Sequence, residues 1–210
     1  MRSGLLFFTI FISSLSFGRP DPSVCEIIIG EPLSNAYGPY DYTNMAQRDK
    51  LPIVLGAHFT SEVERLVAGN TSTDPYGDLN YTLRAIPNYH RALYAISRYD
   101  LRYPDRNKQL QRMGAECFFE RAVYFSPQDY VAYMLYGLHL HRLKRYREAL
   151  EFYKTALSLN DVSAELHNNI GLLYFNMGDI DNADVHARRS KELGYPLNGL
   201  SEKIKASREK

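Results

Sequence analysis

The chain has 210 residues, of which 45% are hydrophobic, so it is long enough to fold around one continuous core and too apolar to be a disordered tail. It carries 25 Lys and Arg against 24 Asp and Glu, a net charge of +1. This balance excludes a general nucleic-acid-binding protein, which needs a surplus of positive charge to displace counterions from phosphates.

Residues 1–18 are expected to be a secretory signal. Arg2 supplies a positive start, residues 5–17 carry no charge, and the small residues Ser16 and Gly18 stand where signal peptidase requires them. The apolar run is shorter than the ~20 residues that span a bilayer. We therefore expect cleavage after Gly18 and a mature protein in the periplasm or outside the cell, with no transmembrane span; an uncleaved membrane anchor is the alternative.

The two cysteines of the chain are Cys25 and Cys117. In an oxidising compartment they can form a disulfide, which would close a long loop and contribute about 4–5 kcal/mol before strain is counted. Such a bond would hold the N-terminal segment against the rest of the chain. The alternative is two unpaired thiols, one of them buried, and the two remain open because a sequence carries no distances.

Residues 19–80 are expected to be irregular, because six of the ten prolines lie there and interrupt helices. One short helix is expected within this segment. Ser61 and Glu64 form a capping box ahead of apolar residues, and Gly69 suits the C-terminal end of a helix. The isoleucines at 27–29 are expected to form a short strand or an extended arm that lies on the helices.

From Tyr81 onward the pattern is nearly continuous helix, and it repeats. Gly137 and Gly171 are 34 residues apart, as are Ala149 and Ala183. Small residues at such positions allow two helices to approach closely, and we expect the alanines to face the glycines. The recurrence therefore predicts stacked helical hairpins.

Three stretches carry this pattern. In the first it reads Leu93, Ile96, Ser97, Ala115, Phe119, Ala122 and Pro127. In the second it reads Tyr133, Tyr136, Gly137, Leu140, Ala149, Tyr153 and Ala156, and in the third His167, Ile170, Gly171, Tyr174, Ala183 and Pro196. This pattern resembles the tetratricopeptide repeat (TPR), which implies an all-α solenoid of helical hairpins.

The resemblance divides the chain into repeats at about 90–129, 130–163 and 164–197 within an array at 81–210. The first repeat departs from the pattern, because it has about six extra residues at 103–108 and carries Asp100 where an aromatic residue is usual. A degenerate unit is expected before it, with residues 79–86 as its second helix. Residues 198–207 are expected to be a polar capping helix, since a terminal repeat must turn a polar face to water.

The whole chain is also similar to exported bacterial TPR proteins. The similarity is carried by residues 38–43, 58–60, 78–85 and 192–197. It implies the fold and export, and it implies no activity.

Catalytic motifs are absent from the sequence: there is no Gly-rich phosphate loop, no Gly-x-Ser-x-Gly turn and no Cys-x-x-Cys unit. His139 and His141 are two residues apart on an expected helix, whereas metal ligands on one helix face are three or four apart. We therefore expect no enzyme, no cofactor and no metal site.

The first helix of each TPR lines the concave side of the array, where partners bind. Helix spacing places twelve residues on that side. They are Arg91, Tyr94, Arg98, Arg102, Met134, Leu138, His141, Arg142, Asn168, Leu172, Phe175 and Asn176. Aromatic, Arg and Asn side chains suit a peptide groove, because Asn can bond a peptide backbone in both senses. The alternative interpretation is that the apolar members belong to the core and the arginines to a solvated face.

The sequence thus favours a non-catalytic adaptor of the bacterial cell envelope that binds another protein or peptide segment, as part of an envelope assembly. The alternative is a ligand-binding protein or enzyme with a site between the N-terminal segment and the array. Its candidate residues would be Tyr40, Asp41, Tyr42 and His58.

Overall fold

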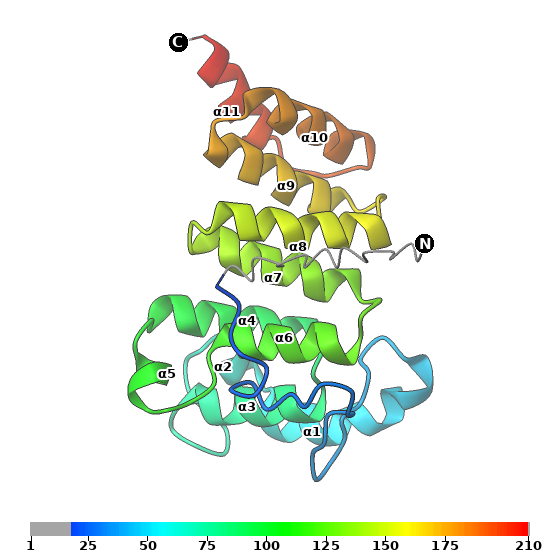
Figure 1. The fold of residues 1–210 in the computed structure, drawn as a ribbon, viewed down its shortest axis with the longest axis vertical. Helices are drawn as coiled ribbons and strands as arrows, with labels where there is room; N and C mark the ends of the chain where they lie inside the picture. Colours follow the sequence, from blue (N-terminus) through cyan, green and yellow to red (C-terminus); the bar gives the residue numbers. More distant parts are fainter. Residues whose placement is uncertain (1–17, 210) are drawn as a thin grey trace, which may run out of the picture.

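The computed structural model describes residues 18–209, and the expected signal up to Phe17 lies outside the described residues. Within this range all regular structure is helical, as expected from the sequence, and the helices stack along the long axis (Figure 1). The helices are η1 Met45–Lys50, α1 Leu51–His58, α2 Ser61–Glu64, α3 Pro75–Ala85, α4 His90–Arg102, α5 Arg106–Gln109, α6 Ala115–Phe125, α7 Tyr130–Arg142, α8 Tyr146–Leu159, α9 Ala164–Met177, α10 Ile180–Glu192 and α11 Gly199–Arg208.

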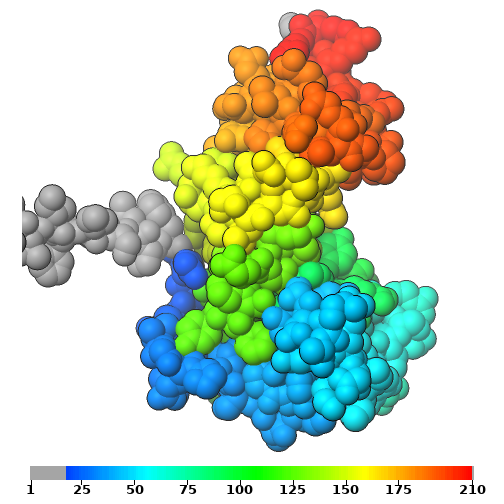
Figure 2. Space-filling view, turned by 90° about the vertical axis from the view of Figure 1, so that its right-hand side faces the viewer, coloured from blue at the N-terminus to red at the C-terminus, as the bar shows by residue number. Residues whose placement is uncertain are grey.

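Three hairpins form the body of the molecule: α4 with α6, α7 with α8, and α9 with α10. Each hairpin packs on the one before it, because α7 contacts both α4 and α6 while α9 contacts both α7 and α8. The first helices of the hairpins therefore lie side by side along one face. Figure 2 shows the result, an elongated molecule with its early residues at one end and α11 at the other.

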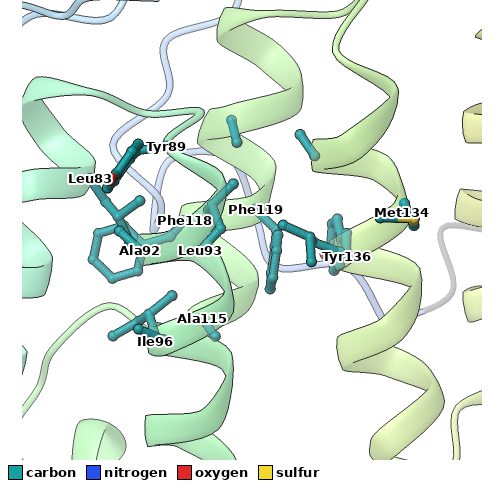
Figure 3. Packing of buried hydrophobic residues seen from close by; sticks show 14 of the residues in the cluster. Leu83, Tyr89, Ala92, Leu93, Ile96, Ala115, Phe118, Phe119, Met134 and Tyr136 are labelled. Carbon is teal, nitrogen blue, oxygen red and sulfur yellow. The ribbon is translucent and has the colours of Figure 1, made fainter. Parts of the chain in front are cut away.

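Aromatic rings fill the space between consecutive hairpins. The ring of Phe119 on α6 stacks on Tyr136 of α7 at 5.0 Å between centroids (Figure 3). The centroid of Tyr136 also lies 3.9 Å from that of the Phe152 ring of α8. These rings belong to one continuous buried cluster that runs from α1 to α9. Because each buried ring contributes about 1.5–3 kcal/mol, the hairpins are held together mainly by this apolar contact.

The glycines of α7 and α9 lie at helix contacts, as the repeat pattern predicts. A Cβ on Gly137 would be 2.7 Å from a ring carbon of Tyr153, and one on Gly171 would be 2.6 Å from Leu200 Cδ2. We expected Ala149 to face Gly137, but the nearest atoms are those of the Tyr153 ring. The glycine therefore accommodates an aromatic ring from α8 and not only a close helix backbone.

Residues 18–34 form a strap without regular secondary structure, with turns at 22–26, visible in Figure 1 as the blue trace across α6. A disulfide joins Cys25 to Cys117 of α6. The buried guanidinium of Arg121 donates hydrogen bonds to the carbonyls of Cys25 and Glu26, at 3.2 and 3.1 Å. The expected strand at 27–29 does not form: Ile27 is buried beside the disulfide, whereas Ile28 and Ile29 are exposed. The extended arm is the alternative that the structure supports.

The segment before residue 80 contains more helix than expected. Pro52 lies in the first turn of α1, where a missing N–H leaves no hydrogen bond unmade, so α1 tolerates it. The predicted short helix is present as α2, but Thr60 caps it in place of Ser61. It ends well before Gly69, because Leu66 takes a positive φ of 60°.

The boundary expected at residue 80 falls inside α3, which begins at Pro75. Asp74 caps α3 by accepting a hydrogen bond from Tyr76 N, and Pro75 occupies its first turn. These are the ordinary signals of a helix start, so α3 begins before the array was expected to begin.

At the opposite end, α11 covers the last hairpin near the position expected for a cap. It buries Leu200 and Ile204 against the cluster formed with Ala183 and Ala187 of α10. Its remaining residues are exposed, which suits the end of a stack. Between residues 18 and 209 no helix is long and apolar enough to cross a membrane.

Candidate functional site

A groove of about 640 Å³ opens on the face formed by the first helices of the hairpins. Helices α7 and α9 form most of its walls, Tyr94 of α4 closes one side, and α11 with the segment before it contributes the other. The lining residues are Tyr94, Leu135, Leu138, His141, Arg142, Lys144, Tyr146, Glu165, Asn168, Asn169, Leu172, Asn176, Tyr195 and Lys203.

Helix periodicity explains why α9 contributes so much of this wall. Glu165, Asn168, Leu172 and Asn176 are three or four residues apart, and Asn169 lies four residues after Glu165, so their side chains form one stripe. Ser163 begins the helix by accepting a hydrogen bond from Leu166 N, and Gly178 ends it in a left-handed conformation with a φ of 82°. These two caps set where α9 begins and ends.

A row of stacked side chains forms the edge of the groove at α4 and α7. The Tyr94 ring lies between two guanidinium groups, that of Arg98 at 5.2 Å and that of Arg142 at 5.1 Å. Arg142 also donates a hydrogen bond to the Tyr94 hydroxyl at 3.1 Å. These contacts hold Arg142 at the rim, because a cation above an aromatic face is attracted by the ring.

His141 is held in its neutral form on the same rim. The amide nitrogen of Asn176 lies 2.8 Å from His141 Nε2, an arrangement in which the amide donates and the ring nitrogen accepts. Burial, with a smaller contribution from Arg142, lowers the pKa of His141 below its ordinary value. His141 therefore serves here as a hydrogen-bond acceptor and not as an acid.

Two neighbouring asparagines, Asn168 and Asn169, line the groove, and the two residues are only 7% and 8% exposed. The amide nitrogen of Asn169 has no hydrogen-bond partner among residues 18–209, but it is itself buried and does not face the open groove. Such a buried donor costs about 1–3 kcal/mol. Asn168 can hydrogen-bond the backbone of a peptide, because its side chain both donates and accepts.

The structure gathers part of the predicted concave set in this groove. The members found there are Tyr94, Leu138, His141, Arg142, Asn168, Leu172 and Asn176.

Two arginines of the first hairpin are engaged by α2 of the same chain. Arg91 donates to a Glu64 carboxylate oxygen at 2.8 Å, and Arg98 donates to the Glu64 carbonyl. Arg102 instead lies over the ring of Tyr103. None of these three arginines lines the groove, whereas Tyr94 of the same helix does.

Two further predictions are corrected. Met134 is 4% exposed and belongs to the continuous core, so it does not line the groove. Phe175 packs against the small cluster formed by α10 and α11. Both corrections have one cause: a rotation of about one residue about a helix axis, some 100°, moves a side chain from the exposed face to the packed one.

Sequence reasoning missed the other half of the lining. Glu165 and Asn169 follow the same helical spacing as Asn168 and could have been found from it. Lys144 lies in the turn after α7, and Lys203 lies on α11. No local pattern places those two beside α9, because only the stacking of the array brings them there.

A second hollow of about 440 Å³ lies between the N-terminal segment and the array. Asn88 donates from its amide nitrogen to Asp41 at 2.8 Å and to Asp129 at 3.1 Å. His90 Nε2 is 2.7 Å from the Asp129 carboxylate, and the Ser126 hydroxyl is 3.3 Å from Asp41. These polar groups satisfy one another, so the network fastens the N-terminal segment to the array.

The candidates for an alternative ligand site are only partly brought together there. Asp41 lines this hollow, and the Tyr42 ring packs edge-on against His90 at 5.0 Å. Tyr40 instead pairs its backbone N–H with the carbonyl of Ala85.

His58, the fourth candidate, lies in a separate network. Its Nδ1 is 2.8 Å from Asp78, and its ring stacks on Tyr81. Across the described part of the chain, no cluster of three His, Cys, Asp or Glu side chains is placed to hold a metal ion.

Comparisons with known proteins agree with this geometry. Two family profiles match the chain, TPR repeat over residues 137–178 and Tetratricopeptide repeat over residues 164–193. No curated protein matches it in sequence.

Among solved structures, PilF of Pseudomonas aeruginosa is 18% identical with a TM-score of 0.51; the match covers 73% of this chain and 64% of that one. MamA of MSR-1 is 20% identical with a TM-score of 0.45, over 68% of this chain and 74% of that one. A likeness at this identity concerns the fold alone. The chain therefore carries tetratricopeptide repeats within an all-helical solenoid.

Proposed function

We propose that this protein is a non-catalytic adaptor of the bacterial cell envelope that binds a segment of another protein in the groove between α7, α9 and α11. The observation that carries the proposal is the groove itself. It combines apolar walls with polar side chains that can bond a peptide backbone, among them Asn168 and Asn176. This is the composition of a site that holds a peptide backbone and packs its side chains.

The shape of the array supports a protein partner over a small molecule. The groove is open along the stack and is walled by helices of successive hairpins, as in repeat proteins that bind along their concave face. The enclosed, polar pocket with unsatisfied titratable groups that catalysis needs is not what these residues form. The polar groups beside the hollow near Asp41 already hydrogen-bond one another.

An envelope location is supported by two features of the chain. The disulfide between Cys25 and Cys117 suits an oxidising compartment such as the periplasm. The sequence of residues 1–18 has the pattern of a secretory signal, with cleavage expected after Gly18. Fractionation of cells that express the chain, followed by mass spectrometry of its N-terminus, tests both the compartment and the cleavage position.

Site-specific photo-crosslinking tests the binding function. A photoreactive amino acid replaces Leu172 in the groove, and in a matched control it replaces Val185, which is 53% exposed on α10. We expect Leu172 to yield one defined cross-linked protein in intact cells and Val185 to yield none. Cross-links to the same proteins from both positions, or from neither, would reject the groove as the binding site.

A further inference from the structure

Positive charge collects in the groove without internal neutralisation. Arg142, Lys144 and Lys203 line it, and all three are exposed. None of them has a carboxylate within 4.0 Å among residues 18–209. Glu165 is the one acidic residue in the lining, so the groove carries a net charge of about +2 at neutral pH.

Several other arginines of the described chain are paired with carboxylates, which sets this cluster apart. Arg145, close to Lys144 in sequence, is 2.6 Å from Glu116 and from Glu148. Arg189 pairs with Glu192 at 3.2 Å. Three cations around one groove repel one another, and a bound anion relieves that repulsion.

The same face already shows how the protein holds an occupant. At the α4 end, the chain's own segment around α2 places Phe59 under the Arg91 guanidinium, 5.7 Å from the ring centroid. Arg91 binds the Glu64 side chain, and Arg98 binds the Glu64 carbonyl. The occupant of this part of the face is therefore a segment that offers an apolar ring, a carboxylate and a backbone oxygen.

The covered part and the open groove are continuous. Tyr94 is stacked between Arg98, which binds α2, and Arg142, which faces the groove. In the open groove, Arg142 offers a guanidinium beside the same Tyr94 ring, and Leu138 and Leu172 offer apolar contact. At the covered part Glu64 supplies the acidic group, whereas no acidic group of the described chain pairs with the cations of the open groove.

We propose that the segment bound in the groove is acidic, with Asp or Glu side chains on both sides of an apolar residue. Its carboxylates would pair with Arg142 and Lys144 at one end and with Lys203 at the other, while the apolar side chain packs between Leu138 and Leu172. The cations come from two parts of the chain, the C-terminal end of α7 with its turn and α11, so we assign a carboxylate to each part. This inference rests on the proposed function, because it names the partner's chemistry at the same site.

Selection from a random peptide library displayed on phage tests the inference and does not require the partner to be identified first. The purified full chain, with its disulfide intact, is the bait. We expect enriched peptides to carry at least two Asp or Glu around an aliphatic or aromatic residue. Replacement of those acids by Gln or Asn should weaken binding by about tenfold or more, measured by fluorescence anisotropy.

A pair of variants on one helix provides the control. Lys203→Glu and Lys205→Glu make the same charge change on α11, but only Lys203 lines the groove. We expect Lys203→Glu to weaken binding of the acidic peptides by about tenfold and Lys205→Glu to leave it within about twofold. Circular dichroism shows whether both variants keep the helical fold.

The outcomes separate this inference from the proposed function. Enriched peptides that are neutral or basic, yet lose binding on Leu172→Asp, would overturn the acidic partner and keep the groove. Equal effects of the Lys203 and Lys205 variants on acidic peptides would also overturn it. Failure to enrich any peptide that depends on Leu172 would count against both proposals.

Discussion

Gly137 shows how one missing side chain positions two helices. A Cβ at this position would lie 2.7 Å from the buried ring of Tyr153, which cannot move without disturbing the core. We expect Gly137→Ala to lower the free energy of unfolding by about 1–2 kcal/mol, because overpacking outweighs the gain in helix propensity. Urea denaturation measures the change.

Gly56 is the matched control. It lies in α1, and a Cβ there would meet nothing within 4 Å. Gly56→Ala should therefore raise the free energy of unfolding by up to about 1 kcal/mol. The two changes in the free energy of unfolding need not be equal in size. A Gly137→Ala variant more stable than the natural chain would contradict the close contact with Tyr153.

Asp100 occupies the position where the repeat pattern usually has an aromatic residue, and the structure gives it a different task. Its carboxylate accepts hydrogen bonds from Ala115 N at the start of α6 and from the amide of Asn107 in the inserted segment. Burial raises the pKa of Asp100 to about 6 even though these hydrogen bonds act to lower it. The inserted residues are thus fastened to α4 and α6 through one carboxylate.

The raised pKa makes stability depend on pH in a defined direction. The folded chain holds the Asp100 proton more tightly than the unfolded chain, so this stabilisation is complete below about pH 4 and is lost as the pH rises through about 6. We expect Asp100→Asn to be more stable than the natural chain by about 1–2 kcal/mol at pH 7, and the gain to disappear near pH 4.

Denaturation curves across this pH range test the prediction. The buried Asn107 Oδ1, which has no partner among residues 18–209, can accept a hydrogen bond from the new amide. A gain that does not change with pH would contradict a raised Asp100 pKa.

At the residue scale, the sequence predicted the glycines correctly because helices that touch need small residues at regular spacing. It could not predict the partner of Gly137, since a ring from α8 reaches the position that Ala149 was expected to fill. It also could not give Asp100 its function, because that depends on where the insertion folds back.

Among the elements, the strap depends most on a single covalent link. The disulfide spans a sequence separation of 92 residues and joins the strap to α6. We expect the double substitution Cys25→Ser and Cys117→Ser to lower the free energy of unfolding by about 2–5 kcal/mol, because it removes a constraint on the unfolded chain.

A reductant should have the same effect on the natural chain and none on the double variant. Thermal unfolding with and without dithiothreitol, together with thiol labelling, measures this. Equal unfolding midpoints for the natural chain in both conditions would show that the link contributes nothing.

The capping helix α11 both closes the stack and brings Lys203 to the groove. Ile204 is 3% exposed in its contact with the last hairpin. We expect Ile204→Ala to destabilise α11 by about 2–3 kcal/mol, so that its amides exchange faster with deuterated water. Exchange in α4 should not change, because repeat arrays are held mainly by contacts between neighbours. Faster exchange throughout the chain would contradict the expectation that the effect stays near α11.

At the element scale, the hairpins α7–α8 and α9–α10 were predictable because the contacts that form them are close in sequence and repeat. The helices α1 and α3 were predicted only in part, because a proline either interrupts a helix or occupies its first turn, and here Pro52 and Pro75 do the second. The cover of α2 over α4 was not predictable, because Glu64 and Arg91 belong to different elements with no shared pattern.

On the scale of the whole molecule, the repeats build a face of which one part is closed and another open. The closed part is held by α2 through Arg91 and Arg98, and the open part is the groove between α7, α9 and α11. The sequence predicted about half of the groove from helix spacing. The rest comes from α11 and from the turn after α7, and only the stacking of successive hairpins brings those residues together.

Hydrogen–deuterium exchange of the chain with and without its cross-linked partner tests the central claim most directly, because it reports on every face at once. Slower exchange is predicted in α7, α9 and α11, with α8 and α10 unchanged. Protection confined to residues 41–43 and 126–131, with α7 and α9 otherwise unaffected, would contradict the account and place the binding site at the hollow beside Asp41.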